Sequence, residues 1–379
     1  MLTDKLTNIA NAIRQKGGTT EKLTLDAMPT AISALSTGGG GGVDIPDEAF
    51  VISGDCSYWD YYGKWDSFIS AYANKWSTSN ISHATSMFYN SKLKTIPFEL
   101  NFDNTATCSC NNLFYGCTEL KEIGKIVNIR SDNISYMFYA CNKLRYLPQF
   151  ENINLTQFQT LSHSNGISAF KECYSLRSIP EDLLKQLYQT KITSIYRSLF
   201  YDNFKSLYAL DEIKGLNPQT EGVFTSNLFN VSFNYCGRAK NIIFAVQEDG
   251  APYIVNWKNQ VINLTSLVGY VFESSDILNY NSGITADKEV VDNATYQALK
   301  DNPDWFSSNI AYSRYNHDSA VATINTLPDT SAYLASAGGT NTIKFKGASG
   351  SATDGGAINT LTEAEIAVAT AKGWTVSLV

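Results

Sequence analysis

The sequence predicts an α+β solenoid of irregular repeats, with a small helical module before it and an α/β cap after it. Three observations support this fold class: an internal repeat within residues 45–283, five consecutive glycines at 38–42, and a different composition after residue 283. Of the 379 residues, 44% are hydrophobic, so the chain can bury a core. At roughly 150 residues per domain, this length fits two or three domains or one long array.

Composition divides the chain into four segments. Residues 1–35 form a helical attachment or oligomerisation module, and residues 36–44 form a Gly-rich linker that is flexible because glycine chains have little stiffness. Residues 45–283 hold the repeat body with its N-terminal cap. Residues 284–379 hold C-terminal capping repeats, which we expect because the last core face of a solenoid would otherwise meet water.

The N-terminal module carries an apolar stripe at helical spacing. A first helix is expected to end at Gly17-Gly18, and a second begins near Pro29. The module is too small to hold a core of its own, so we expect its stripe to pack against another subunit or another protein. The candidate docking residues are Leu2, Leu6, Ile9, Ile13 and Ile32.

The repeat is clearest in five segments that share a phenylalanine. They are Met87-Phe-Tyr-Asn-Ser, Leu113-Phe-Tyr-Gly-Cys, Met137-Phe-Tyr-Ala-Cys, Ala169-Phe-Lys-Glu-Cys and Leu199-Phe-Tyr-Asp-Asn. Weaker copies begin at Leu228-Phe and Val271-Phe, and the spacings between starts are 26, 24, 32, 30, 29 and 43 residues. These spacings are typical of solenoid repeats.

Each copy has a finer pattern that predicts two elements. Cys110, Leu113, Phe114 and Cys117 lie at i, i+3, i+4 and i+7, which predicts one buried face of a two-turn helix. A second apolar pair follows, as at Leu120/Ile123, and predicts a short extended segment. One unit is therefore expected to be a short helix and a short strand, and stacked units would bury a continuous core.

The two ends of the array also carry local signals. Thr362 and Glu365 form a capping-box pattern for a helix that Gly373 ends, followed by a strand from Trp374. The segment 342–347 alternates like a strand. Two more helices are expected, one over Asn293–Asp301 and one with Trp65, Phe68, Ile69 and Tyr72 on its apolar face within an N-terminal cap.

The repeat resembles the BspA-like class of leucine-rich repeat. The resemblance covers roughly residues 80–283 and is strongest at Asn133-Ile-Ser-Tyr-Met-Phe-Tyr-Ala-Cys-Asn-Lys-Leu. It implies an irregular, leucine-rich-repeat-like solenoid. The common leucine-rich consensus with an asparagine ladder is not present in the sequence, so a regular horseshoe is not expected.

Two further stretches resemble proteins of bacteriophages. Residues 2–32 are similar to a short module in structural proteins of tailed phages, and residues 361–374 look like the end of repeat proteins from gut-bacterial phages. Together the resemblances imply a virion fibre or spike that contacts other virion proteins through residues 1–35 and binds a host-surface glycan or protein. They bring no catalytic residues. We also expect a homo-oligomer, because a bundle of copies would bury the short helices.

Composition and motifs argue against several other classes. The net charge of −7 disfavours a nucleic-acid-binding surface. No stretch approaches ~18 consecutive apolar residues, and the N-terminus lacks a signal-peptide pattern, so neither membrane insertion nor secretion by that route is expected. No motif indicates an enzyme or a cofactor. Acidic candidates for a glycosidase pair exist, but nothing in the sequence favours them: Asp211, Glu212, Asp301 and Asp304.

The cysteines and histidines are interpreted as structural rather than as metal ligands. Cys117, Cys141 and Cys173 recur at one place in the repeat. We place Ser91, Asn203 and Ser275 at the same place in other copies, which a ligand site would not tolerate. Cys108-Ser-Cys110 lacks further ligands nearby in sequence. His317-Asp318 could form a catalytic pair, but without an activated nucleophile a polar loop contact is favoured. We therefore predict no metal site.

Tyrosine supplies the candidate binding surface. Tyr89, Tyr115, Tyr139 and Tyr201 each follow a core phenylalanine by one residue, about 100° from the buried stripe of a helix. Stacked repeats would place these rings in a row. We expect the row to contact a neighbouring subunit or a sugar, with packing between adjacent repeats as the alternative. Other functions left open are a capsid-attached head fibre or decoration protein, a bacterial surface adhesin, and a polysaccharide-degrading tail spike.

Overall fold

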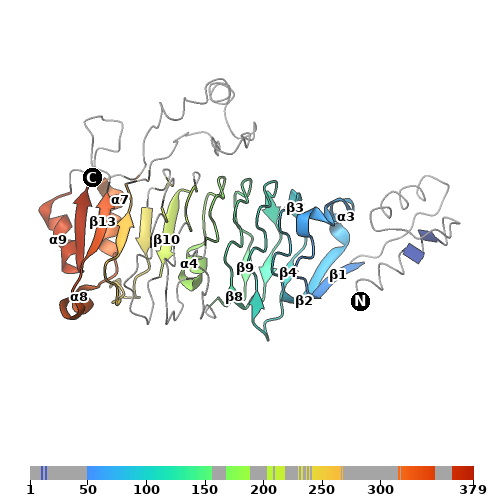
Figure 1. The fold of residues 1–379 in the computed structure, drawn as a ribbon, viewed down its shortest axis with the longest axis horizontal. Coiled ribbons are helices and arrows are strands. Elements are labelled where there is room, and N and C mark those ends of the chain that lie inside the picture. Colours follow the sequence, from blue (N-terminus) through green and yellow to red (C-terminus); the bar gives the residue numbers. More distant parts are fainter. Residues whose placement is uncertain are drawn as a thin grey trace, which may run out of the picture.

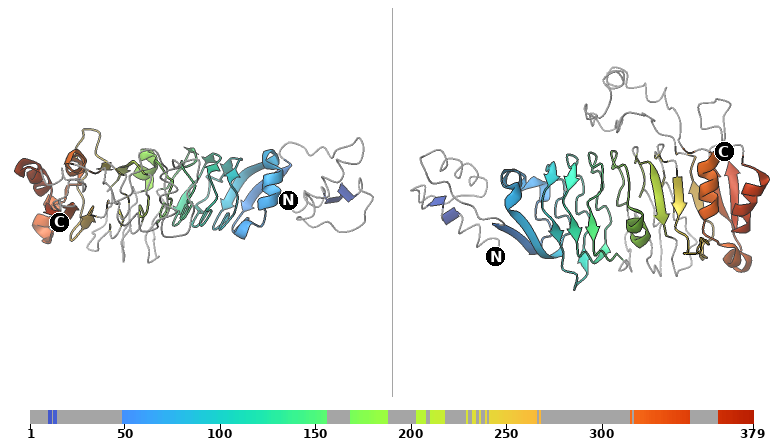
Figure 2. Two further views of the ribbon diagram at one scale, coloured as in Figure 1. Left: turned by 90° about the horizontal axis from the view of Figure 1, so that it is seen from above. Right: turned by 180° about the vertical axis from the view of Figure 1, so that it is seen from behind.

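The computed structural model mixes helix and strand and is elongated, with successive coils of the chain lying side by side along its length (Figure 1). Figure 2 shows the same row of coils from two other directions. The structure describes residues 10–11, 13–14, 49–155, 168–187, 203–207, 210–217, 229, 232–233, 236, 239, 241–265, 267, 315, 317–345 and 361–379.

The first coil is closed by a parallel pair of strands and a short helix. The elements are β1 (Phe50–Asp55), η1 (Tyr61–Gly63), α3 (Asp66–Ala71), η2 (Ala73–Lys75) and β2 (Trp76–His83). β1 and β2 pair in register from Phe50 opposite Trp76. The helix expected on this apolar face is confirmed, since Phe68 and Ile69 of α3 are buried and the Phe68 ring lies 4.9 Å from that of Phe50.

The following coils are joined by very short parallel strands. The strands are β3 (Thr95–Ile96), β4 (Leu100–Asn101), β5 (Cys108–Ser109), β6 (Glu122–Ile123), β7 (Ile126–Val127), β8 (Ser131–Asn133) and β9 (Phe150–Glu151). β3 pairs with β6, β4 with β7, β7 with β9, and β5 with β8, in every case with the strand of the next coil. The extended segment expected at the second apolar pair is confirmed at Ile96 and Ile123.

The two-turn helix expected in each copy is wrong for the four copies that the structure describes, those of Phe88, Phe114, Phe138 and Phe170. Residues 111–116 form consecutive turns, and Asn112 and Gly116 have φ of +56° and +71°, in the left-handed region. The turns direct alternate N–H groups to the neighbouring coil: Phe114 N donates to the carbonyl oxygen of Met137 at 2.8 Å. The four apolar side chains predicted for the buried face are still buried: Cys110, Leu113, Phe114 and Cys117.

A column of phenylalanine rings runs through the core of these coils. Adjacent rings are stacked, with centroid distances of 5.5 Å for Phe88–Phe114, 5.4 Å for Phe114–Phe138 and 6.1 Å for Phe138–Phe170. All four side chains are buried. Such stacking adds to the free energy of burial, so the repeated phenylalanine is the residue that holds each coil on the next.

The register expected for the fifth copy is wrong by four residues. The core ring of that coil is Phe204, which stacks on Phe233 at 5.7 Å, and Glu172 N donates to the carbonyl oxygen of Lys205 at 3.0 Å. Two phenylalanines four positions apart, Phe200 and Phe204, both fit the sequence pattern, and only the pairing between coils separates them. Asn203 therefore does not share the place of the repeated cysteines; Leu207 does. The predicted segment Leu199-Phe-Tyr lies outside the described residues.

The second half of the stack, from its middle to its C-terminal end, carries most of the regular helices that the structure describes (Figure 1). Its elements are α4 (Glu181–Leu187), β10 (Glu212–Leu216), β11 (Asn241–Phe244), β12 (Val261–Asn263), α7 (His317–Thr326), α8 (Ser331–Ala337), β13 (Asn341–Phe345), α9 (Glu363–Ala371) and β14 (Trp374–Leu378). β10 pairs with β11, and β12, β13 and β14 form a parallel sheet in that order. None of the helices described is both long and apolar enough to cross a bilayer.

The local signals at the C-terminus are confirmed. The side chain of Thr362 accepts from Glu365 N, and the Glu365 side chain accepts from Thr362 N, so the capping box is complete. Gly373 has φ of +82° after the helix, and the strand from Trp374 pairs with β13. These elements form as predicted because each signal is satisfied within a few residues of the chain.

Several expectations fall on residues that the structure does not describe. They are most of the N-terminal module, the Gly-rich linker, the copy at Val271-Phe272 and the helix over 293–301. Of the docking candidates only Ile13 is described. It lies in a helical turn and is buried within the chain, as is Ala10.

Candidate functional site: a tyrosine face

Four tyrosine rings stack in a column parallel to the phenylalanine column. The centroid distances are 5.1 Å for Tyr61–Tyr89, 4.7 Å for Tyr89–Tyr115 and 4.6 Å for Tyr115–Tyr139, with interplanar angles of 27°, 6° and 11°. We call Tyr61, Tyr89, Tyr115 and Tyr139 the tyrosine ladder. Three of its members were expected from the sequence to share one flank, and the structure brings them together.

The fourth member, Tyr61, was missed because its coil has no core phenylalanine. Asp60 occupies that place: its N–H donates to the carbonyl oxygen of Met87, as Phe88 N donates to that of Leu113. Tyr61 follows Asp60 and so enters the ladder. The sequence signal for this coil would have been the run Tyr58-Trp-Asp-Tyr-Tyr62, taken without requiring a phenylalanine.

The ladder ends on a lysine rather than on a further tyrosine. Lys171 holds the equivalent place in the next coil, and its Nζ lies 5.5 Å from the centroid of the Tyr139 ring. The Tyr139 hydroxyl donates to Glu172 Oε1 at 3.1 Å. In the following coil, Lys205 holds the place that the ladder tyrosines hold in theirs. Tyr201, which was predicted for this place, is therefore not part of the row, and it lies outside the described residues.

The ladder rings are partly buried between adjacent coils and partly exposed to solvent. Tyr89, Tyr115 and Tyr139 are each half-buried, because neighbouring rings cover their faces while their edges remain at the surface. Burial raises the pKa of the Tyr115 and Tyr139 hydroxyls. A sugar cannot lie flat on Tyr89 or Tyr115, since both faces of each ring are already covered. What the ladder offers a partner is a row of ring edges and hydroxyl groups.

Three more tyrosines extend the ladder into a broader surface. Tyr58 and Tyr62 pack edge-on against Tyr61 at one end, and Tyr136 packs edge-on against Tyr115 and Tyr139 at the other. We call these three residues together with the ladder the tyrosine face. Tyr58 and Tyr62 are 56% and 63% exposed, so this end presents large apolar area to solvent.

A shallow hollow of about 540 Å³ lies on the tyrosine face. Its lining combines ring edges with amide, hydroxyl and ammonium groups, from Tyr89, Asn111, Asn112, Tyr115, Ser135, Tyr136, Tyr139 and Lys171. Such a lining can donate and accept hydrogen bonds, and its ring edges can contact the apolar part of a ligand. These properties suit a polar ligand with hydroxyl groups.

The tyrosine face begins beside a buried acid. Asp60 has no exposed surface, and its Oδ1 accepts from Trp65 N at 2.5 Å. Burial raises the pKa of Asp60 to about 8, and the neighbouring Asp66 carboxylate adds to the shift. Asp66 is held by Ser91 Oγ and Lys92 N, both at 2.7 Å. Burial therefore favours the neutral form of the Asp60 carboxyl group, whose Oδ1 fixes the backbone at Trp65.

The repeated cysteines have a structural explanation. The thiols of Cys117, Cys141 and Cys173 each donate to the carbonyl oxygen of the phenylalanine in the preceding coil, at 2.9, 3.1 and 2.9 Å. Burial raises the pKa of Cys141 and Cys173, which favours the thiol over the thiolate that metals bind. Cys236, which the repeat pattern did not include, bonds Phe204 in the same way.

The paired cysteines on β5 are also buried. The sulfur atoms of Cys108 and Cys110 lie 3.6 Å apart, and burial raises the pKa of Cys110. Within the part of the chain that the structure describes, no three side chains of His, Cys, Asp or Glu gather as a metal site would require.

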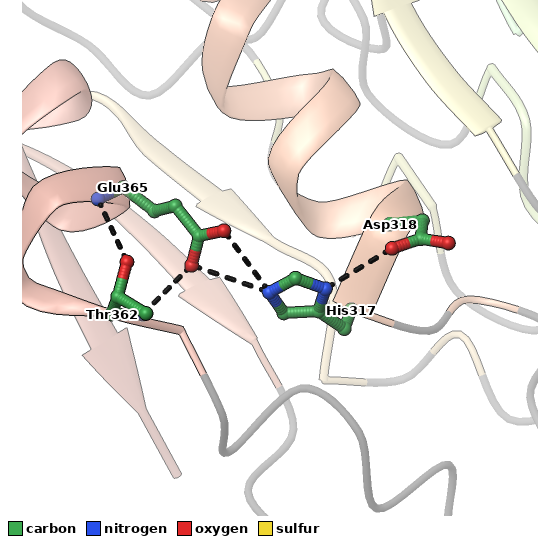
Figure 3. A network of polar contacts seen from close by, with 4 residues as sticks. All are labelled: His317, Asp318, Thr362 and Glu365. Carbon is green, nitrogen blue, oxygen red and sulfur yellow. Dashed lines mark hydrogen bonds and ion pairs between the residues drawn. The ribbon is translucent and has the colours of Figure 1, made fainter.

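His317 joins two helices instead of activating a nucleophile. Its Nδ1 lies 3.1 Å from Asp318 Oδ1, and its Nε2 lies 3.2 Å from the Glu365 carboxylate, so α7 is tied to the start of α9 (Figure 3). Hydrogen bonds to Asp318 and then to Glu365 raise the pKa of His317. Because both ring nitrogens meet carboxylates, the imidazolium form is favoured.

Two further findings differ from what the sequence predicts. Asn128 Nδ2 donates to Asn101 Oδ1 at 3.0 Å, and Asn152 Nδ2 donates to Asn128 Oδ1 at 3.2 Å, so a three-member asparagine ladder exists although no consensus predicted it. Asp211 and Glu212 lie together beside a second hollow, whereas Asp301 and Asp304 fall outside the described residues.

Comparison of the chain with protein-family models, with curated proteins and with solved structures finds no match.

Proposed function

We propose that this chain is a non-enzymatic structural protein of a phage virion, a fibre or spike anchored by residues 1–35. In this proposal the stacked coils are a leucine-rich-repeat-like solenoid of the BspA-like class. The chain forms a homo-oligomer and binds a glycan or protein of the host surface through the tyrosine face. The observation that carries the binding role is the continuous array of seven tyrosines over adjacent coils.

Backbone conformation supports a role for this surface beyond packing. Tyr58, Tyr62 and Tyr136 have φ of +58°, +57° and +58°, where a bulky side chain costs about 1–2 kcal/mol. The places of Tyr58 and Tyr136 are taken in the intervening coils by Ser86 and Asn112, whose N–H groups make the same bonds between coils. Ser86 and Asn112 therefore fill this place in two coils, and tyrosine fills it in the coil before them and in the coil after them. Such retained strain is typical of functional surfaces.

The anchoring role rests on residues 1–35, which resemble the attachment module of tailed-phage structural proteins. An elongated body suits a fibre, because it carries a binding surface away from the particle. Many copies on one particle would strengthen weak individual contacts. The same features fit a capsid-attached head fibre or decoration protein, which is the first alternative.

Labelling of intact particles tests the proposal. Antibodies against residues 80–283, viewed by electron microscopy, should mark the tail tip, and their Fab fragments should block adsorption to host cells. Label over the capsid would favour the head-fibre alternative. Absence of label from particles would overturn the virion proposal in favour of a bacterial surface adhesin.

Surface variants test the binding role separately. Tyr62→Ser should weaken binding of the purified chain to host cells by roughly tenfold, as loss of an interface tyrosine commonly does. Tyr333→Ser on α8, away from the tyrosine face, is the matched control and should bind as the unaltered chain does. Release of reducing sugars from host polysaccharide would replace the proposal with a degrading spike.

A further inference from the structure

A second hollow, of about 620 Å³, is lined in part by Glu181 of α4. The helix α4 lies farther along the stack than the strands β3 to β9 (Figure 1). The lining of this hollow differs from that of the tyrosine face, because it holds charges of both signs around one exposed ring. The lining residues are Tyr146, Arg177, Ser178, Ile179, Glu181, Asp211, Glu212 and Lys214. We call it the Tyr146 hollow.

The hollow arises from the order of side chains on three successive coils. Arg177 N donates to the carbonyl oxygen of Arg145 at 2.9 Å, and Asp211 N donates to that of Arg177 at 3.3 Å. The next residues along these three segments are Tyr146, Ser178 and Glu212. They therefore lie one after another on the outer surface of three adjacent coils. Adjacent parallel segments lie about 4.8 Å apart, so the backbones at Tyr146 and Glu212 are separated by roughly 10 Å. The small Ser178 side chain leaves the space between them open.

Tyr146 differs from the stacked rings of the tyrosine ladder because it is a largely exposed ring. It is 60% exposed, and among the residues described no aromatic ring packs against it. Its backbone is joined to the next coil by an isolated parallel bridge to Ser178. A largely exposed aromatic ring next to polar groups is a surface on which the C–H face of a ligand can lie.

The polar groups across the hollow are held in place by their own partners. Glu212 Oε1 accepts from Asn241 Nδ2 at 3.0 Å, and Glu212 Oε2 pairs with Lys214 Nζ at 2.8 Å. Glu181 pairs with Lys185 at 2.8 Å. A carboxylate has about four acceptor positions on its two oxygens, so groups that are already held by partners can also accept hydrogen bonds from hydroxyl groups of a ligand.

The balance of charge narrows the class of ligand. Two cations, Arg177 and Lys214, face three carboxylates, Glu181, Asp211 and Glu212. A polyanion would meet the carboxylates at close range, and like charges so placed are unfavourable. The apolar floor is small, since Ile179 is almost fully buried, so the hollow gives little room for an apolar peptide side chain. A neutral ligand rich in hydroxyl groups fits both constraints.

We propose that the Tyr146 hollow is a saccharide-binding site for a neutral pyranose oligosaccharide. One sugar ring lies with its C–H face on Tyr146, and its hydroxyl groups donate to Asp211 and Glu212 across the floor at Ser178. The proposal does not rest on the function proposed above, because the site is separate from the tyrosine face and needs no virion. No bond is formed or broken in it.

The purified full-length chain provides the test, with arrayed oligosaccharides of four to six rings that are neutral, N-acetylated or uronic. We expect neutral and N-acetylated probes to bind and uronic probes not to bind. The best binder is then titrated by calorimetry. Tyr146→Ala should weaken it roughly tenfold or more, whereas Tyr146→Phe should keep it within about threefold, because the ring and not its hydroxyl makes the platform.

Two further variants test whether the saccharide binds in this hollow and not elsewhere on the chain. Ser178→Trp should abolish binding by filling the space between Tyr146 and Glu212, and circular dichroism will show that the chain stays folded. Tyr333→Ala removes a tyrosine of α8 that lines neither hollow and should leave this affinity unchanged. Failure of all neutral probes to bind, binding confined to uronic or peptide probes, or an unaltered affinity in Tyr146→Ala would overturn the proposal.

Discussion

The rings of Tyr115 and Tyr139 stack face to face, with centroids 4.6 Å apart and planes 11° from parallel. This contact joins two coils at the surface, as Phe114 and Phe138 join them in the core at 5.4 Å. The tyrosines therefore serve stability and recognition together, and a variant that removes a ring affects both. Tests of the surface must separate the ring from its hydroxyl group.

Tyr115→Phe and Tyr115→Ser should differ sharply in stability. The phenylalanine variant keeps the stacked rings, so its free energy of unfolding should lie within about 0.5 kcal/mol of the unaltered chain. The serine variant loses two stacking contacts and buried area and should lose about 2–4 kcal/mol. Denaturant titration followed by tyrosine and tryptophan fluorescence measures both. Equal stability of the two variants would show that the ladder contributes nothing to folding.

Asp60→Asn should change the pH dependence of stability. The folded pKa of Asp60 is raised to about 8, so its contribution is complete below the unfolded pKa of 3.8 and is lost as pH rises through about 8. Asparagine keeps the neutral state at every pH. We expect similar melting temperatures near pH 4 and a more stable variant at pH 9, by about 1–3 kcal/mol.

Thermal melts at pH 4, 6, 8 and 9 measure this difference, with Asp249→Asn in an exposed turn as the control. A variant that lost stability only at the higher pH values, and not at pH 4, would show instead that the Asp60 carboxylate is needed in its charged form.

Protonation of His317 should stabilise the C-terminal helices. Its folded pKa is raised, so the stabilisation is complete below the unfolded value of 6.5 and is lost as pH rises through the raised folded pKa. Glu365→Gln keeps a side chain that can complete the capping box but removes the negative charge. The pKa of His317 should then fall.

Proton NMR of the three histidines follows this titration, with His83→Gln used to assign one of the other signals. An unchanged titration of His317 in the glutamine variant would contradict the pairing in Figure 3.

Substitutions at equivalent places in two adjacent coils should change the free energy of unfolding in opposite directions. Gly116 has φ of +71°, and an added Cβ would lie 1.9 Å from Asn90 Oδ1, so Gly116→Ala should lose about 2 kcal/mol or more. Ala140 holds the same place in the next coil with φ of +58°. Ala140→Gly removes a left-handed alanine and should gain up to about 1 kcal/mol. Chemical denaturation of both variants checks the signs; a loss of stability in Ala140→Gly would show that this φ is not strained.

Local signals in the amino-acid sequence were enough to predict part of the fold and part of the site. The capping box of Thr362 and Glu365, the left-handed Gly373 and the strand from Trp374 could be predicted because each depends on neighbours within a few residues. The buried face of each copy and the common flank of Tyr89, Tyr115 and Tyr139 followed from periodicity alone. These features are independent of which coil lies beside which.

The pairing of the coils was settled by contacts between distant segments of the chain. The turns at 111–116 have the apolar periodicity of a helix, but alternate N–H groups in them donate to the next coil. Whether this segment forms turns or a helix therefore depends on a segment more than 20 residues away in the chain. The same pairing selected Phe204 over Phe200, brought Tyr61 into the ladder, and set Tyr146 opposite Glu212. Spacing within a segment constrains which side chains are buried, whereas hydrogen bonds between segments set the register, and both tyrosine sites depend on register.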